Sequence, residues 1–267
     1  MAQEKWLVDG EKTIDLEIVN SLKISLIAGR IDVIGHDEPH TRIEVHSVSG
    51  RDLKISIDGD HLEIDHPQLR WDNFVEVFGT FRGKARADVS VRVPRDVALS
   101  FGVVSAEALI AGLRADATLS TVSGSIVVDD HVGDLQLNAV NGEVQVQSLA
   151  GDLSARSVSG DITAAGSIGR FSADTVSGSV FADLTGVPDR ARVNTVSGAV
   201  TARLALGMPA QYRINTVSGR LQLDDAHIAG VRGSYESRYG DLDDRWLEFR
   251  ANTVSGDISV LHAEAAQ

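Results

Sequence analysis

A chain of 267 residues, of which 43% are hydrophobic, is long and apolar enough to bury a core, which excludes a disordered protein. The net charge of −13 opposes the binding of phosphate backbones, so nucleic acid is not an expected partner. The absence of cysteine excludes disulfides and thiol chemistry, and no transmembrane segment or signal peptide is evident. We therefore expect a cytoplasmic location, with the cell surface left open through another export route.

The first part of the chain, residues 1–102, is rich in short runs that alternate between apolar and polar residues, which predicts strands. A hairpin is expected to turn at Asp58-Gly59. The stretch 66–87 is irregular and aromatic, and we treat its aromatic residues either as a candidate binding surface or as part of a local core: Trp71, Phe74, Phe78 and Phe81. This part is predicted to be a β-rich N-terminal cap.

The remainder, residues 103–267, repeats one short sequence. TVSGSI begins at Thr121, and near copies follow with a spacing of about 18 residues at first and longer steps later. The glycines that mark the copies are Gly124, Gly142, Gly160, Gly178, Gly198, Gly219 and Gly256. We also interpret Tyr239-Gly240-Asp241-Leu242 as a degenerate copy, which divides the last long step. A fixed period of this kind predicts stacked coils.

The expected fold is all-β: a parallel β-helix, or β-solenoid, of coils of about 18 residues with the irregular cap at its N-terminal end. Two rows of aliphatic side chains are expected to point inward. One follows the glycine: Ile126, Val144, Ile162, Val180, Val200, Leu221, Leu242 and Ile258. The other precedes the serine: Val104, Val122, Val140, Val158, Val176, Val196, Val217 and Val254. To turn Val140 inward, the chain must bend near Asn138 and Ala139. The serine is expected to bond at a corner, and the glycine to allow close approach or a positive φ.

Three segments together resemble a known family. They are G-R-I-D-V at 29–33, V-R-V-P-R at 91–95 and the serial V-S-G units. In these features the chain is similar to the bacterial DUF4097 family, β-strand repeat proteins that carry the provisional label of adhesins. The resemblance implies a right-handed parallel β-helix or β-solenoid and an adhesive role, and it supplies no catalytic residues.

Few residues in the sequence are candidates for metal binding or catalysis. The turns Gly133-Asp134 and Gly151-Asp152 lack the second glycine pair of calcium-binding β-rolls, so no metal or other cofactor is expected. One acidic cluster lies where the repeat is most distorted, and it is a candidate surface or binding site: Asp241, Asp243, Asp244 and Trp246. Paired carboxylates there would suit glycoside hydrolysis, but a solvated surface loop is the preferred interpretation. No catalytic residue is assigned.

Three functions stay open. The first is a non-enzymatic binding or scaffold protein, adhesin-like, with an unknown protein or glycan as its partner. The second is a self-assembling β-helix, which would associate through its ends by way of the last coil, Ile258 to Leu261. The third is a carbohydrate-active β-helix enzyme. We expect the first, and therefore expect no enzymatic activity.

Overall fold

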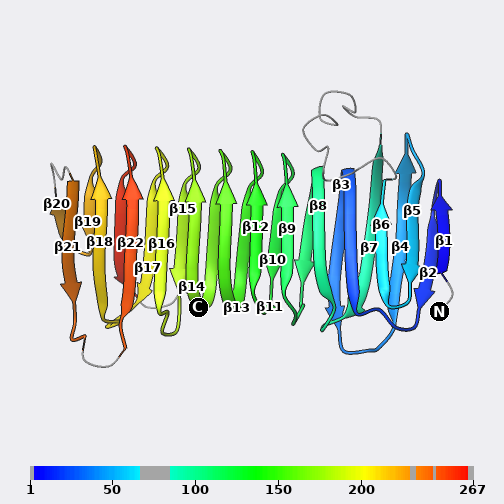
Figure 1. Cartoon of the computed structure of the whole chain (residues 1–267), viewed down its shortest axis with the longest axis horizontal. Coiled ribbons are helices and arrows are strands. Elements are labelled where there is room, and N and C mark those ends of the chain that lie inside the picture. The colour runs from blue at the N-terminus through cyan, green and yellow to red at the C-terminus, as the bar shows by residue number, and fades with distance from the viewer. Residues whose placement is uncertain (1–2, 67–84, 229–232, 243–244, 264–267) are drawn as a thin grey trace. The chain divides into compact units, whose positions relative to one another are not determined.

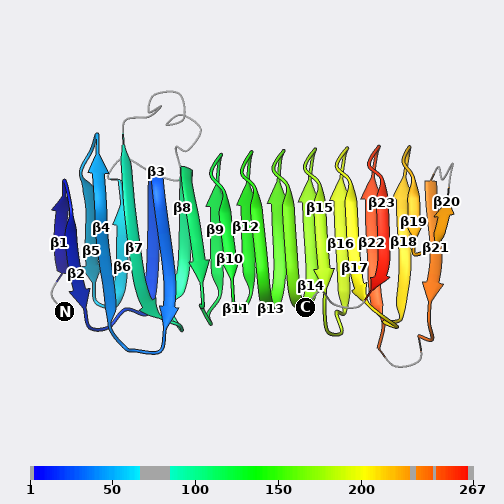
Figure 2. The ribbon, with the colours of Figure 1, turned by 180° about the vertical axis from the view of Figure 1, so that it is seen from behind.

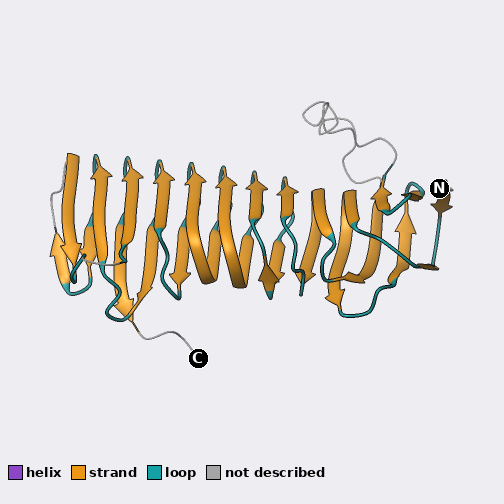
Figure 3. Cartoon of the chain, turned by 60° about the horizontal axis from the view of Figure 1, so that its bottom comes forward, coloured by secondary structure: helices purple, strands orange, loops and turns teal. Residues whose placement is uncertain are grey.

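The computed structural model describes residues 3–66, 85–228, 233–242 and 245–263. Every element in these ranges is a strand and none is a helix, which confirms the all-β class (Figure 3). Accordingly, the described part of the chain holds no helix that is long and apolar enough to span a membrane. By its contacts the chain divides into two compact units, Met1–Val132 and Gly133–Gln267.

The described residues of the first unit form eleven strands: β1 (Gln3–Val8), β2 (Lys12–Leu16), β3 (Ser21–His36), β4 (Thr41–Ser49), β5 (Leu53–Asp58), β6 (His61–Asp65), β7 (Arg86–Pro94), β8 (Ala98–Ala111), β9 (Ala117–Thr121), β10 (Ile126–Asp129) and β11 (His131–Val132). The predicted hairpin at Asp58-Gly59 is confirmed, because β5 and β6 are antiparallel and join there. Gly59 adopts a φ of 65° in this turn.

The two long strands β3 and β8 form the parallel part of the first unit. β3 pairs in parallel with β6 through its first part and with β7 through its second part, and from Ser21 to Ile34 it also pairs in parallel with β8. β8 continues this pattern by pairing with β9 and then β10. The outer strands β4 and β5 are instead antiparallel to β7 and β6, and β1 and β2 pair with them in the same sense.

In the second unit, the part of the chain that the structure describes forms twelve strands: β12 (Leu135–Ala139), β13 (Val144–Ser157), β14 (Ile162–Thr175), β15 (Val180–Leu184), β16 (Arg190–Thr195), β17 (Val200–Ala205), β18 (Ala210–Thr216), β19 (Leu221–Leu223), β20 (Ala226–Ile228), β21 (Gly233–Tyr239), β22 (Leu247–Thr253) and β23 (Ile258–Ala263). The first half of β14 pairs in parallel with β15, and its second half with β16. The two halves of β14 therefore belong to two separate ladders of parallel strands.

The C-terminal strands do not extend the ladders in chain order. β22 pairs in parallel with β16 on one side and with β18 on the other, and β23 lies between β17 and β19 in the same way. In Figures 1 and 2 the red strands β22 and β23 therefore stand between yellow and orange ones. Beyond β18 and β19, the antiparallel strands β21 and β20 complete the ladders.

The core of the second unit is built from side chains in register across the strands. The predicted row that follows the glycine is confirmed for seven of its eight members, which are buried: Ile126 in the first unit, and Val144, Ile162, Val180, Val200, Leu221 and Ile258 in the second. A second buried row consists of Leu135, Leu153, Phe171, Ala191, Phe249 and Tyr212. The one small residue, Ala191, lies between two phenylalanines, which leaves room for their rings. Tyr212 meets Phe249 edge to face with ring centroids 6.0 Å apart.

The prediction that the valine of T-V-S-G points inward is wrong for the second unit. Val176 is 49% exposed, and the equivalent valines are exposed as well: Val140, Val158, Val196, Val217 and Val254. The buried residue is the preceding hydroxyl residue, because the oxygen of Thr175 accepts a hydrogen bond from the backbone N–H of Gly178 at 3.0 Å. Valine and the following serine both point outward, and this pair of outward residues shifts the alternation.

The predicted bend at Asn138 and Ala139 is also wrong. Ala139 continues the buried alternation of Leu135 and Leu137, and Val140 is exposed as strict alternation requires. The serine does bond at a corner: Ser177 donates through both its backbone N–H and its hydroxyl to the carbonyl oxygen of Val158, at 2.9 and 3.3 Å.

The glycine of the motif allows close approach. A Cβ at Gly198 would lie 1.9 Å from the carbonyl oxygen of Gly178, far inside van der Waals contact. Because the glycines stack in this way, Gly256 lies on Gly198 and Gly219 lies on Gly256, which is the same order that the strand pairing gives.

Two further predictions fail at the C-terminal end. Leu242 lies outside the buried row, since Tyr239 ends the antiparallel strand β21 and Gly240 is a turn residue with φ of 70°. The strand from Ile258 to Leu261 does not present a free edge, because β17 and β19 cover both of its sides. The last strands of the ladders are β20 and β21 rather than β23, and end-to-end self-assembly stays a prediction.

Candidate functional site

An extended form of the repeat occurs three times, as R-x-N-T-V-S-G at 192–198, 213–219 and 250–256. Because side chains alternate along a strand, the arginine, the asparagine and the valine of one copy all point to the same outward face. Strand pairing places Asn194 opposite Asn252, and Asn252 opposite Asn215. The three copies thus form three rows across β16, β22 and β18.

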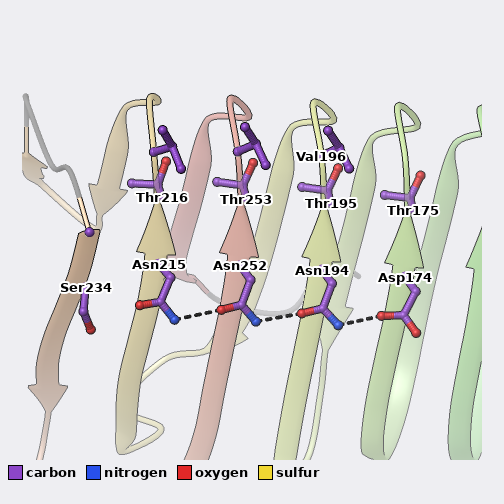
Figure 4. Close-up of a pocket in the computed structure, with 13 residues that line it drawn as sticks. Asp174, Thr175, Asn194, Thr195, Val196, Asn215, Thr216, Ser234, Asn252 and Thr253 are labelled. Carbon is purple, nitrogen blue, oxygen red and sulfur yellow. Dashed lines mark hydrogen bonds between the residues drawn. The ribbon is translucent and has the colours of Figure 1, made fainter.

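The asparagine row consists of Asn194, Asn252 and Asn215, and its side chains form a directional chain of hydrogen bonds (Figure 4). Asn215 Nδ2 donates to Asn252 Oδ1 at 2.8 Å, and Asn252 Nδ2 donates to Asn194 Oδ1 at 2.7 Å. Asn194 Nδ2 then donates to Asp174 Oδ1 at 2.6 Å. A carboxylate only accepts hydrogen bonds, so Asp174 fixes the direction of the whole chain. Each amide keeps a second N–H that can be donated to a ligand.

The arginine row consists of Arg192, Arg250 and Arg213, which occupy directly paired positions. Glu248 holds part of this row: its Oε1 lies 2.9 Å from Arg250 Nε and 3.5 Å from Arg213 Nη1. Its Oε2 accepts from Arg190 Nε at 3.1 Å. Burial opposes ionisation of Glu248, but the hydrogen bond and charge of Arg250, with those of Arg190, hold the pKa of this carboxyl below its ordinary value.

Positive charge exceeds negative charge on this face. Arg156, which lies 4.0 Å from Asp174, and Arg190 add to the three arginines of the row, giving five cations. Four of them share three carboxylates: Asp174 contacts Arg156, Glu236 contacts Arg213, and Glu248 contacts Arg190, Arg213 and Arg250. Arg192 is exposed and has no ion pair within the described part of the chain. The excess is local, since the whole chain carries −13.

The valine row consists of Val196, Val254 and Val217, each between 47% and 62% exposed. It borders a groove of about 520 Å³ that is also lined by the asparagine row, the threonines between them, and Ser234 of β21 at one end (Figure 4). A second hollow of about 240 Å³ is lined by the arginine row together with Asn215 and Asn252. Because both hollows share these two asparagines, they adjoin.

The residues singled out in the sequence lie elsewhere or outside the described ranges. Trp71, Phe74, Phe78 and Phe81 lie outside the described residues, and so do Asp243 and Asp244. Asp241 and Trp246 are exposed on the segment between β21 and β22, and they line neither hollow. They remain candidate surface residues.

The sequence analysis did not predict the arginines and asparagines of this site, because it treated only the shared T-V-S-G unit as the repeat. The discriminating signal stood two and four positions before the valine: Arg and Asn occur there together in only three copies, whereas Asp174 and Ser172 occupy these positions in another copy. Only the strand order shows that these three copies are neighbours, since 36 residues of chain separate the second motif's Ser218 from the third's Val254.

These features define an all-β protein with a polar outward face and two adjoining hollows in it. The family model described as Toastrack DUF4097 matches residues 19–261, and the chain belongs to this family. No curated protein matches the chain.

The solved structures that are similar to this chain include the following two. One is provisionally described as a cell adhesion protein from Clostridium sporogenes; it is 12% identical, with 95% of this chain and 100% of that chain covered and a TM-score of 0.31. The other is provisionally described as an adhesin from Bacteroides fragilis; it is 11% identical, with 94% of this chain and 97% of that chain covered and a TM-score of 0.39.

Proposed function

We propose that the chain is a non-enzymatic binding module of adhesin type, whose ligand is a linear polysaccharide lying across β16, β22 and β18. The observation that carries the proposal is the asparagine row: three identical amides at one strand spacing, about 4.8 Å, each with an N–H to donate. A ligand that repeats the same hydroxyl groups along its length can use all three.

The valine row suits the same ligand. Sugar rings present C–H groups on their faces and hydroxyl groups at their edges, so they need an apolar surface beside hydrogen-bonding groups. Val196, Val254 and Val217 supply the apolar surface along one side of the asparagine row. An open groove that runs across several strands accommodates a chain rather than a single small molecule.

A binding role is better supported than a catalytic one. Asp174, the carboxylate that lines the groove, is engaged by Asn194 and by Arg156. Asp241, the described aspartate of the acidic cluster considered for glycoside hydrolysis, is exposed and lines neither hollow. The sequence alternative of a carbohydrate-active enzyme gains no support from these contacts. A polysaccharide ligand favours the cell surface over the cytoplasmic location expected from the sequence.

The β-solenoid architecture belongs to this proposal. The two halves of β14 pair with β15 and β16, which is the arrangement expected when each repeat contributes one strand to each of two faces. Stacked repeats bring equivalent side chains into rows, and the proposed ligand binds to these rows.

The proposal is tested by retention of the whole chain on a panel of defined polysaccharides that includes dextran, methyl-esterified pectin and polygalacturonate. We expect at least one to retard the chain in affinity electrophoresis, and Asn252→Ala to abolish or strongly reduce this, because Asn252 lies in the middle of the row. Gln145→Ala, on the other ladder, is the control that removes a comparable amide. Retardation by no polysaccharide, or equal retardation of Asn252→Ala and the wild type, would refute the proposal.

A further inference from the structure

We propose that the polysaccharide bound on this face is acidic, with carboxylate or sulfate groups along its length that bind the arginine row. This inference rests on the proposed function and adds the chemical class of the ligand.

The first observation is the register of the arginines. Arg192, Arg250 and Arg213 lie at directly paired positions on three adjacent parallel strands, so they repeat at about 4.8 Å. Guanidinium groups bind carboxylate and sulfate groups through paired N–H donors, and the hydroxyl groups of a neutral sugar lack the negative charge that strengthens this contact. A row of three predicts a ligand that carries an acidic group on successive sugars.

The second observation is the distance between the rows. Arginine and asparagine are two residues apart on each strand, which places the two rows roughly 7 Å from each other. The two hollows share Asn215 and Asn252, so one ligand can touch both rows. A sugar ring whose hydroxyl groups contact the asparagines would place an acidic substituent on its far side over the arginines.

The third observation is charge. Like charges set side by side are unfavourable, and three arginines in register would repel one another without Glu248. Glu248 compensates only part of this charge, and Arg192 has no ion pair among the described residues. An acidic ligand would supply the missing negative charge, so ligand binding would explain why three arginines lie in register.

Nucleic acid is the competing polyanion, and the lining of the two hollows disfavours it. No aromatic residue lines either hollow, so bases would find no ring on which to stack.

The test compares ligands that share one backbone. Binding of the whole chain to polygalacturonate and to its fully methyl-esterified form is measured by calorimetry at low and at high salt, with an oligomer of deoxythymidine as a third probe. We expect affinity for polygalacturonate that falls with salt, and affinity for the ester at least about tenfold weaker.

Two variants with opposite expected effects complete the test. Arg192→Gln should weaken polygalacturonate binding about tenfold, whereas Arg114→Gln, an exposed arginine of the first unit, makes the same change in net charge and should have no effect. Glu248→Gln should strengthen binding several-fold, because it removes the carboxylate that competes with the ligand for Arg250.

The outcomes separate the two proposals. Equal binding of the ester and the acid would overturn the acidic class while leaving polysaccharide binding in place. Unchanged binding by Arg192→Gln, or weaker binding by Glu248→Gln, would also overturn it. Binding of the oligonucleotide alone, or of none of the probes, would overturn both proposals.

Discussion

Asn252 donates a hydrogen bond to Asn194 across a separation of 58 residues, and the same side chain accepts one from Asn215. This contact exists because β22 enters the ladder between β16 and β18. The strand order thus creates the asparagine row and the arginine row together, and both proposals depend on it.

The strand order can be tested with cysteines, because the chain has none of its own. Thr201 and Gln222 each pair with Ser259, from opposite sides. Mild oxidation should therefore link Thr201→Cys to Ser259→Cys, whose Cα atoms lie at one strand spacing, within the limit for a disulfide. The link is detected as a loss of two thiols by mass spectrometry.

The matched control is the pair Thr201→Cys and Gln222→Cys. These positions are two strand spacings apart, roughly 10 Å, which a disulfide cannot bridge. They would be neighbours if the repeats followed chain order. Linking of this pair, without linking of Thr201→Cys to Ser259→Cys, would show that β23 does not lie between β17 and β19.

The outward position of the valines predicts a contrast within one repeat. Val176→Asp should change the free energy of unfolding by less than about 1 kcal/mol, because Val176 is 49% exposed. Val180→Asp makes the same substitution at a residue that is 1% exposed, and it should destabilise severely, since the buried charge has no partner. Urea denaturation measures both. Similar losses for the two variants would mean that Val176 is buried.

Val176 and Val180 also show how much of this fold can be predicted from the sequence. The period and the all-β class follow from the spacing of the glycines, and Val180 was placed correctly because it begins an alternating run. Val176 was misplaced because threonine and valine have the same shape, so the sequence does not show which of them turns inward. The hydrogen bond from Gly178 to Thr175 decides it, and that contact depends on the local backbone.

The candidate site was harder to predict than the fold. The motif R-x-N-T-V-S-G is visible in the sequence, and alternation alone places Arg192 and Asn194 on one face. Their neighbours are not visible, because the third copy reaches its place only after β20 and β21 have reversed the chain direction. Such a return depends on long-range pairing, for which the local pattern holds no signal.

The close stacking of the glycines predicts a strong effect of one methyl group. Gly198→Ala would place a Cβ 1.9 Å from the carbonyl oxygen of Gly178, so the backbone must move, and we expect a loss of roughly 1–3 kcal/mol or more. Gly10→Ala meets no atom within 4 Å and should be close to neutral. Thermal unfolding of both variants checks this. A neutral Gly198→Ala would contradict the close approach of successive repeats.

A buried histidine predicts how stability depends on pH. His66 is fully buried, and its Nδ1 accepts a hydrogen bond from the backbone N–H of Ile27 at 3.3 Å, which requires a neutral ring. Burial, with a smaller effect from the charge of Arg51, lowers the pKa of His66 from 6.5 to about 4. The unfolded chain therefore takes up this proton first as the pH falls.

The stability that neutral His66 contributes is complete above pH 6.5 and is lost as the pH falls toward about 4, by roughly 3 kcal/mol in total. His66→Leu should remove this part of the pH dependence, so that the free energy of unfolding falls less between neutral and mildly acidic pH than in the wild type. Urea titrations at several pH values measure the difference. Identical pH dependence in the two proteins would show that His66 takes up its proton equally in the folded and unfolded states.

Binding of an acidic polysaccharide to the asparagine and arginine rows is tested most directly by a nuclear magnetic resonance titration of the whole chain with a short oligogalacturonate, observing the side-chain N–H signals of asparagine and arginine. We expect the signals of Asn194, Asn252 and Asn215, and those of Arg192 and Arg250, to shift together and to saturate with one affinity. Shifts confined to other residues, or no shifts at all, would contradict it.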